Sequence, residues 1–463
     1  MSQHELADRI AALMPRAKAD LTELVSIPSV ADPRQYPSEE CRRAAQWVAD
    51  AFTEAGLHDV HLAETPDGSA AVLGHRPPPP GAPTVLLYCH YDVQPPLDDD
   101  AWTSPPFTLT ERDGRWYGRG TADCKGNIVM HLTALRALGD GLPVGLRFVA
   151  EGSEEQGTGG LEEYVERHRE QFLADALLIC DTGNAAVGRP TVTTSLRGLA
   201  GVVVTVSTLG AELHSGMFGG PAPDALAALV QILSTLRDPD GGTRIDGLDS
   251  SGTWSGAPYD EEQFRRDADV LDGVSLTGSG TVSDRLWARP AVTVLGIDCP
   301  PVVGSSAAVQ GTARARVSLR VPPGTNADAA LLALTAHLEK AAPWGAHVSV
   351  ESEGTGAPFR AATDGPAYAT LGRAMADVYG EPMAALGQGG SIPLCNVLTN
   401  AYPRAEIVLM GVEEPQCLIH APNESVDPTE IQHMAHVEAL FLSRYAVARR
   451  SASPYGPHRV FLE

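Results

Sequence analysis

The sequence has little positive charge. Its 463 residues include 34 lysines and arginines against 58 aspartates and glutamates, which gives a formal net charge of −24 at pH 7. Binding to nucleic acid rests mainly on basic side chains that neutralise phosphates, and the chain has no basic run. We therefore do not expect nucleic acid as a partner.

Cysteine is also scarce and forms no recognisable pattern. The seven cysteines are widely scattered, and no two of them make a Cys-x-x-Cys pair. This spacing argues against a zinc finger or a disulfide scaffold and favours a reducing compartment. The chain shows no signal-peptide pattern and no apolar run long enough to cross a membrane, so we predict a cytoplasmic protein without a membrane partner.

Two common catalytic patterns are missing. The sequence Gly-x-Ser-x-Gly, which exposes the nucleophilic serine of many hydrolases, does not occur. The glycine-rich segment 117–127 lacks the Gly-x-Gly-x-x-Gly and P-loop patterns that cradle phosphates. The sequence thus supports neither serine hydrolysis nor a phosphate-binding role for this loop.

Strand-like and helix-like segments alternate along much of the chain. Apolar runs at 70–73, 84–89, 144–150 and 176–180 alternate with amphipathic stretches at 126–138 and 161–172, which predicts an α/β fold with a mainly parallel sheet. From residue 199 onward the pattern changes to strands with helices at 224–236 and 327–341. We expect a main catalytic domain in two parts, 1–198 and 356–463, around an inserted α+β, ferredoxin-like domain at 199–355.

Three of the predicted strands end in residues suited to metal binding. The first runs into His90, the second into Glu154 and Glu155, and the third into Asp181. In a parallel sheet the carboxyl ends of the strands open into the ligand crevice. Each feature also has an ordinary explanation, since acidic residues after strands commonly cap helices and a histidine commonly makes a structural hydrogen bond.

Other acidic residues fit the same interpretation. Of the adjacent pair Glu154 and Glu155, one can bind a metal while the other stays free as the general base for a metal-bound water. Asp92 can accept the ring N–H of His90 and fix its tautomer. Asp123, in the glycine-rich loop, either caps the following helix or bridges two metal ions.

Several ordered motifs resemble those of the M20 metallopeptidases, and among these the carnosinase-like dipeptidases. They lie at 90–95, 102–107, 118–126, 151–155 and 214–220, and the similarity spans about residues 21–444. The resemblance implies two divalent metal ions with Asp123 shared between them. The other implied ligands are His90 and Asp181 for one ion, and Glu155 and His420 for the second.

The resemblance also implies the supporting residues of this centre. Glu154 would be the general base and Asp92 would support His90. Members of the family often have a cis peptide after the bridging aspartate, so the state of the peptide between Asp123 and Cys124 is worth examining. The mixed nitrogen and oxygen donors suit Zn²⁺, although Mn²⁺ and Co²⁺ accept the same donors. A rival thiol-containing site is raised by the neighbouring cysteines, but alternation along a strand turns Cys89 and Cys180 into the core.

Substrate contacts are implied by the resemblance alone. His214 would reach the scissile carbonyl, in its own subunit or across a homodimer formed through the inserted domain. Arg320, Gly390 and Ser391 would hold a substrate carboxylate. The ordinary alternatives are a surface histidine, a solvated arginine face of a sheet, and a plain turn.

We therefore predict a two-metal hydrolase that cleaves the amide bond of dipeptides or short peptides with a free C-terminal carboxylate, through a metal-bridging water activated by Glu154. The alternative is an N-acyl-amino-acid amidohydrolase, of the deacetylase or desuccinylase type, on the same scaffold. A non-catalytic binding protein would lack ligands or the base, and the sequence contains all of them. The sequence does not indicate which substrate side chains are preferred.

Overall fold

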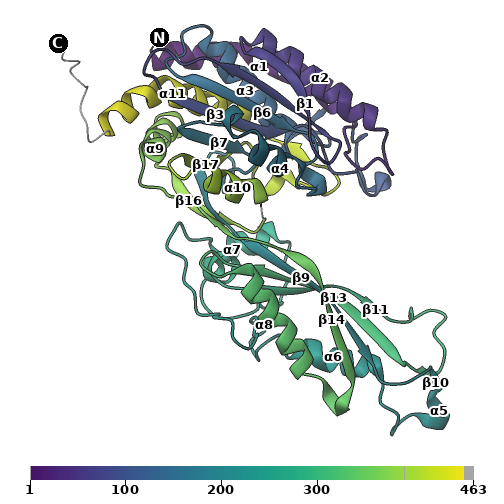
Figure 1. Ribbon diagram of the computed structural model, residues 1–463. Coiled ribbons are helices and arrows are strands. Elements are labelled where there is room, and N and C mark those ends of the chain that lie inside the picture. Colours follow the sequence, from purple (N-terminus) through teal and green to yellow (C-terminus); the bar gives the residue numbers. More distant parts are fainter. Residues whose placement is uncertain (1, 391, 453–463) are drawn as a thin grey trace. The chain divides into compact units, whose positions relative to one another are not determined.

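The computed structural model describes residues 2–390 and 392–452, and Figure 1 shows its helices and strands. The chain forms two compact units. The first consists of Met1–Thr194, Ala361–Leu386 and Leu394–Glu463, and the second of Ser195–Arg360 and Gly387–Pro393. The second unit is therefore inserted between strands that belong to the first.

The first unit is built on a large sheet whose centre is parallel. The four central strands, in spatial order, are β6 (Gly145–Glu151), β3 (Thr84–His90), β7 (Ala176–Cys180) and β17 (Glu406–Met410). Antiparallel strands extend the sheet on both sides: β2 (Ala70–Arg76) and β1 (His58–Glu64) beside β6, and β8 (Thr191–Leu196) beside β17. The predicted α/β class is confirmed, and the parallel pairing is confined to the centre of the sheet.

Shorter strands complete the set. β16 (Ala384–Gln388) and β15 (Phe359–Arg360) pair with β8, and β4 (Thr110–Arg112), β5 (Arg115–Tyr117) and β18 (Ser425–Val426) form a small separate sheet. This small sheet matters for the site because β18 pairs with β5, which brings the segment around residue 424 next to residue 118.

Amphipathic helices cover the large sheet. One face carries α1 (Gln3–Val25), α2 (Ser38–Glu54), α3 (Lys125–Leu138), α9 (Pro366–Tyr379) and α11 (Pro428–Ala452), while α4 (Gly160–Arg167) and α10 (Pro393–Ala401) lie on the other side (Figure 1). In α1 the buried residues Leu6, Ile10 and Leu21 recur at helical spacing, as the sequence predicts for a covering helix. Among the described residues, no helix is long and apolar enough to cross a membrane.

The second unit contains a four-stranded antiparallel sheet backed by two helices. Along the chain its elements are β9 (Gly198–Ser207), α6 (Ala225–Ser234), β11 (Ala291–Asp298), β13 (Thr312–Val321), α8 (Ala327–Lys340) and β14 (His347–Gly356). The spatial strand order is β11-β13-β9-β14. This β-α-β-β-α-β order is the ferredoxin-like arrangement predicted from the sequence. Further short elements are β10 (Leu213–His214), β12 (Ala308–Val309), α5 (Ser215–Phe218) and α7 (Glu261–Asp267).

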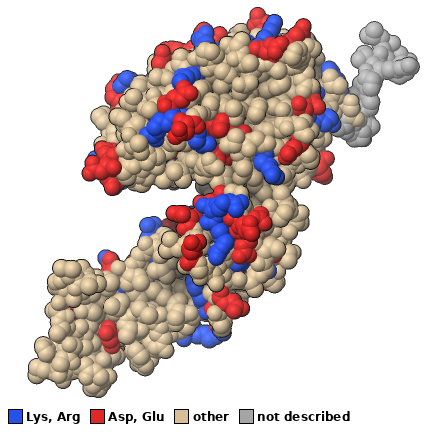
Figure 2. Space-filling model, turned by 180° about the vertical axis from the view of Figure 1, so that it is seen from behind, with Lys and Arg blue, Asp and Glu red and all other residues tan. Residues whose placement is uncertain are grey.

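One end of the second unit is apolar and almost free of charge. It carries β10 and α5, and Figure 2 shows few charged atoms there. The segments 213–222 and 299–311 contain no Lys, Arg, Asp or Glu. Large apolar side chains are nevertheless exposed in this region, namely Met217 at 76 %, Val302 at 93 % and Val303 at 90 %.

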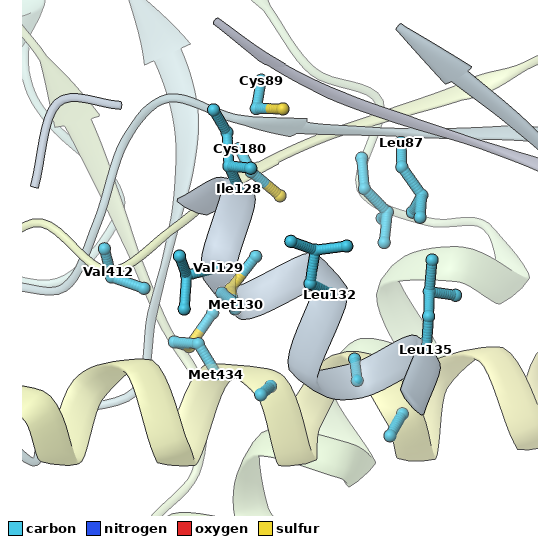
Figure 3. Packing of buried hydrophobic residues seen from close by; sticks show 14 of the residues in the cluster. Leu87, Cys89, Ile128, Val129, Met130, Leu132, Leu135, Cys180, Val412 and Met434 are labelled. Atoms are coloured by element: carbon cyan, nitrogen blue, oxygen red, sulfur yellow. The ribbon is translucent and has the colours of Figure 1, made fainter. Parts of the chain in front are cut away.

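The core of the first unit lies between the sheet and α11. Helix α3 is buried on almost every side, so it behaves as a core helix rather than a surface helix. Figure 3 shows its side chains, including Ile128 and Leu132, among Leu87 of the sheet and Met434 of α11. Cys89 and Cys180 belong to the same core, which confirms the expectation drawn from strand alternation.

Candidate metal centre

The carboxyl ends of the central parallel strands meet at one edge of the sheet. Strand β3 ends at His90, β7 is followed directly by Asp181, and β6 runs into the turn that contains Glu154 and Glu155. Because β6, β3 and β7 are parallel neighbours, these side chains are delivered to the same place.

The first group of donors surrounds His90, which is fully buried. Its Nε2 lies 2.8 Å from Oδ1 of Asp123 and 3.0 Å from Oδ1 of Asp181. Burial alone would lower the pKa of His90, but the neighbouring Cys124, Asp181 and Asp123 raise that pKa well above its ordinary value. An imidazole nitrogen facing two carboxylates in a buried space is an arrangement that suits a divalent cation.

The second group of donors uses the other oxygen of Asp123. Nε2 of His420 lies 2.9 Å from Oδ2 of Asp123 and 3.1 Å from Oε2 of Glu155. Hydrogen bonds to these two carboxylates raise the pKa of His420 to about 11. Asp123 therefore presents one oxygen to each of two histidines, which is how a carboxylate shared by two metal ions is expected to lie.

Asp92 is buried behind these groups and organises two of them. Its carboxylate oxygens accept hydrogen bonds from the main-chain nitrogens of Glu154 (3.2 Å) and Glu155 (3.0 Å). Nδ1 of His90 is 3.1 Å from the main-chain oxygen of Asp92 and 3.4 Å from its carboxylate. Nδ1 of His90 thus faces Asp92, close to both its main-chain oxygen and its carboxylate, and the predicted support of His90 by that carboxylate stays a prediction.

Glu154 and Glu155 differ in their surroundings. Burial, together with the charge of Asp181, raises the pKa of Glu154 well above its ordinary value. Burial and the charge of Asp123 raise the pKa of Glu155 to about 7, although the hydrogen bond from His420 opposes this shift. Glu155 contacts His420 and so belongs to the second group of donors. Among the described residues, Glu154 makes no hydrogen bond to His90 or His420.

Glu424 fixes the loop that carries Asp123. Its fully buried carboxylate accepts hydrogen bonds from Arg119 Nη1 (2.7 Å) and from the main-chain nitrogens of Gly120, Ala122 and Asp123 at 3.0, 3.1 and 3.1 Å. The sequence motif around His420 contains Glu424, but the sequence alone assigns it no role. Its spacing of four residues from His420 is the only signal that could have identified it.

Cys124, the residue after Asp123, carries a thiol that makes a hydrogen bond of its own. The Asp123–Cys124 peptide is cis, as the peptide at this position often is in the family that the sequence resembles. The Sγ of Cys124 lies near His90 and Asp181, within the range of a metal-binding group, but it donates a hydrogen bond to the main-chain oxygen of Cys180 at 3.0 Å. Burial raises the pKa of Cys124 to about 12, so in the metal-free protein the thiol keeps its proton.

Divalent cations fit this set of donors. Two imidazoles and several carboxylates converge here, with the imidazole of His420 exposed and that of His90 buried, and burial raises the pKa of three of the carboxyl groups: Glu154, Glu155 and Asp181. Buried carboxylates that crowd together are unfavourable unless cations or protons compensate their charge. Imidazole and carboxylate together suit Zn²⁺, Mn²⁺ or Co²⁺.

The predicted substrate residues lie in the second unit. His214 is exposed on β10, and its Nδ1 accepts a hydrogen bond from the main-chain nitrogen of Gly216 at 3.1 Å. Arg320 lies near the end of β13, and burial lowers its pKa. Gly390 lies in the turn that follows β16, and Ser391 lies outside the described residues.

A buried arginine close to Arg320 has no counterpart in the sequence-based prediction. Arg197 is buried, and its Nε and Nη1 have no hydrogen-bond partner among the residues that the structure describes. Burial and the charge of Arg320 lower the pKa of Arg197 to about 10. A Cβ at Gly389 would lie 2.7 Å from Nη2 of Arg197, so the guanidinium touches the turn that contains Gly390.

Two proteins with similar sequences are dipeptidases. The cysteinylglycine-S-conjugate dipeptidase of Corynebacterium striatum is 44 % identical over 441 residues, which cover 94 % of this chain and 97 % of that protein. The β-Ala-His dipeptidase of Homo sapiens is 28 % identical over 418 residues, which cover 84 % of this chain and 82 % of that protein.

Solved structures show the same fold. The crystal structure of human carnosine dipeptidase 1 matches with a TM-score of 0.82 and 25 % identity, covering 96 % of this chain and 99 % of that one. An M20 metallo-carboxypeptidase from Sulfolobus solfataricus matches with a TM-score of 0.79 and 24 % identity, covering 93 % and 99 %. Residues 86–444 match the model of peptidase family M20/M25/M40, and a match over this much of the chain means that the protein belongs to that family.

Proposed function

We propose that this protein is a two-metal dipeptidase, which hydrolyses the amide bond of dipeptides or short peptides that have a free C-terminal carboxylate. The observation that carries the proposal is the position of Asp123, whose two carboxylate oxygens face the two histidines His90 and His420. The relatives named above are dipeptidases, and the 44 % identity to one of them extends over almost the whole chain.

The ligands of the two ions follow from the grouping of the donors. His90 and Asp181 would hold one ion, Glu155 and His420 the other, and Asp123 would be shared. When bound, such ions lower the pKa of a water molecule and polarise the carbonyl that is attacked. Zinc suits the donors, and manganese or cobalt would be held by the same side chains.

Glu154 would act as the general base. It follows β6 directly beside the ligand Glu155, and its turn is held by hydrogen bonds to Asp92. Burial raises its pKa, which makes the carboxylate a stronger base for the proton of the attacking water, and it would then pass that proton to the leaving amine.

A C-terminal carboxylate would be anchored by residues of the second unit. Arg320 and the turn at Gly390 fit this role, with Ser391 predicted beside them. The buried, unpartnered guanidinium nitrogens of Arg197 add two donors near the same turn, which supports an anion there. His214 would stabilise the negative charge that develops on the scissile carbonyl oxygen.

A homodimer through the second unit is part of the proposal. The exposed apolar residues Met217, Val302 and Val303 lie in the segments 213–222 and 299–311, which contain no Lys, Arg, Asp or Glu. Exposed apolar patches of this kind commonly mark protein interfaces. The apparent mass of the purified protein in solution tests this, and a monomer at all concentrations would contradict it.

A substrate panel separates the proposal from its alternative. We expect the zinc-loaded protein to hydrolyse dipeptides such as Cys-Gly, β-Ala-His and Ala-Ala with a higher kcat/KM than N-acetyl- or N-succinyl-amino acids. A dipeptide amide, which lacks the carboxylate, should react poorly because the buried arginine nitrogens would lose their acceptor. A preference for the N-acyl compounds would instead identify an N-acyl-amino-acid amidohydrolase.

A further inference from the structure

An acidic residue, Glu413, also follows the fourth central strand, β17. Strands β3, β6 and β7 are each followed by residues of the proposed metal centre. Strand β17 pairs in parallel with β7, so that Met410 lies opposite Cys180 at the carboxyl ends. Glu413 lies three residues after the end of β17, and Asp181 lies directly after the end of β7. Both therefore emerge at the same edge of the sheet.

A close approach of two main chains holds Glu413 beside Asp181. Gly183 and Glu413 form a parallel β-bridge, and the main-chain nitrogen of Asn184 donates to the main-chain oxygen of Glu413 at 2.8 Å. A Cβ at Gly183 would lie only 1.9 Å from that oxygen. Because position 183 has no side chain, the segment after β17 can lie directly against the segment after β7.

The side chain of Glu413 is buried and has an unpartnered carboxylate oxygen. Its exposure is 6 %, and Oε1 has no hydrogen-bond partner in the part of the chain that the structure describes. A carboxylate oxygen of Glu413 lies within 4.8 Å of carboxylate oxygens of Asp123 and Asp181, so the three could hold one ion. A buried, unpaired carboxylate beside two others is strongly unfavourable unless a cation or a proton compensates its charge.

The next residue, Glu414, differs from Glu413 in its hydrogen-bond partners and serves as a comparison. Glu414 is also buried, but its Oε1 lies 2.5 Å from Nη2 of Arg115, and its Oε2 accepts a hydrogen bond from the main-chain nitrogen of Gln416. Glu414 therefore has a full set of partners, away from the donors of the metal centre.

We propose that Glu413 is a further carboxylate of the metal centre and acts on the ion assigned to His90 and Asp181. This inference rests on the proposed two-metal function. Glu413 groups with Asp123 and Asp181 but not with Glu155 and His420, so its influence should fall on one of the two ions. It would bind that ion directly or hold its ligands, and in either case its removal weakens metal binding.

The test is a zinc titration of the metal-free protein in competition with a chromophoric chelator. The wild type, Glu413→Gln and Glu414→Gln are compared. We expect two zinc ions in the wild type, one of them bound about tenfold or more weakly in Glu413→Gln, and both unchanged in Glu414→Gln. Zinc affinities within twofold of the wild type in Glu413→Gln, or an equal loss in Glu414→Gln, would overturn the inference.

Two further measurements separate this role from a purely structural one. Melting of the metal-free proteins shows whether Glu413→Gln folds: a structural role would lower the melting temperature and leave zinc affinity unchanged. If the glutamine variant fails to fold, Glu413→Asp must bind one ion more weakly than the wild type while Glu414→Asp does not. A wild type that binds fewer than two ions would contradict the proposed function itself, independently of Glu413.

Discussion

Asp92 and Glu424 position the residues that we assign to the chemistry without touching a substrate. Asp92 holds the turn of Glu154 and Glu155, and Glu424 holds the loop of Asp123. Both carboxylates accept hydrogen bonds from main-chain nitrogens, which fixes backbone geometry more strictly than contacts between side chains would. The roles of individual residues can therefore be separated by substitution.

Replacing the proposed base should abolish turnover without removing the metals. Glu154→Gln keeps the size of the side chain but cannot accept a proton, so kcat for a dipeptide should fall by about 10²- to 10⁴-fold while zinc content stays at the wild-type level. The exposed Glu166→Gln is the matched control and should retain full activity. Substantial turnover in Glu154→Gln would remove this residue as the base.

Replacing Glu424 should chiefly reduce stability. The change Glu424→Gln leaves Arg119 without its buried partner and weakens the acceptor of three main-chain nitrogens, so we expect a loss of about 3 kcal/mol in the free energy of unfolding, measured in urea. Glu163, which pairs with Arg167 on the surface, should change stability by less than about 1 kcal/mol when replaced by Gln. Equal effects of the two substitutions would show that the loop does not depend on Glu424.

At the scale of elements, the turn between β1 and β2 is tied to the segment after β6. Burial raises the pKa of Asp67, but hydrogen bonds from Thr158, Thr65 and Ser153 outweigh it, so that the net pKa is lowered. A lowered folded-state pKa means that the stabilisation is fully present above the unfolded pKa of about 3.9 and is lost as the pH falls through the folded value.

Asp67→Asn should therefore show a pH-dependent loss of stability. We expect its melting temperature to lie below that of the wild type at pH 7 and the difference to shrink as the pH falls below about 4. Melting curves from pH 7 down to pH 3 check this. A difference that stays constant over that range would mean that the charge of Asp67 does not contribute.

The contact between the ends of β7 and β17 depends on Gly183. In Gly183→Ala the new Cβ would meet the main-chain oxygen of Glu413, so the two segments must move apart, and we expect a loss of about 1–3 kcal/mol in stability together with weaker zinc binding. Gly141→Ala is the control, because its nearest neighbour would be 3.9 Å away. If the free energy of unfolding and the zinc affinity of Gly183→Ala equal those of the wild type, the close approach of the two segments contributes to neither.

The sequence predicted the central elements well because their signals are local. Runs of apolar residues identify β3, β6 and β7, and the helix expected at 126–138 is α3 at Lys125–Leu138. The helix expected at 161–172 ends earlier, at Arg167, and a separate helical turn follows it at Arg169–Gln171. The strand β1 was not predicted, since its exposed outer face breaks the apolar run.

Contacts between distant segments set the limit of prediction. The roles of Glu413, Glu424 and Arg197 depend on neighbours that the sequence does not place: Glu424, for instance, binds a loop about 300 residues earlier. Of the implied ligands, His90, Glu155 and Asp181 follow strand ends that the sequence shows, whereas Asp123 and His420 are assigned by the resemblance. Their grouping around Asp123 is visible in the structure, while their roles as ligands stay predictions that metal analysis must test.

At the scale of the whole molecule, the proposed metal centre would be assembled from both parts of the chain that flank the inserted unit. His90, Asp123, Glu155 and Asp181 precede the insertion, and His420 follows it. The ferredoxin-like unit can therefore be inserted without separating the ligands. Its proposed roles, substrate anchoring and dimer formation, are independent of the metal-binding geometry and can fail without affecting it.

The most direct test of the central claim is the rate of Cys-Gly hydrolysis during a zinc titration of the metal-free protein. The account predicts no turnover without metal and a rise in rate that is complete at two zinc ions per chain, because Asp123 is shared by two groups of ligands. Turnover that persists in the metal-free protein, or a rate that is complete at a single ion, would contradict it.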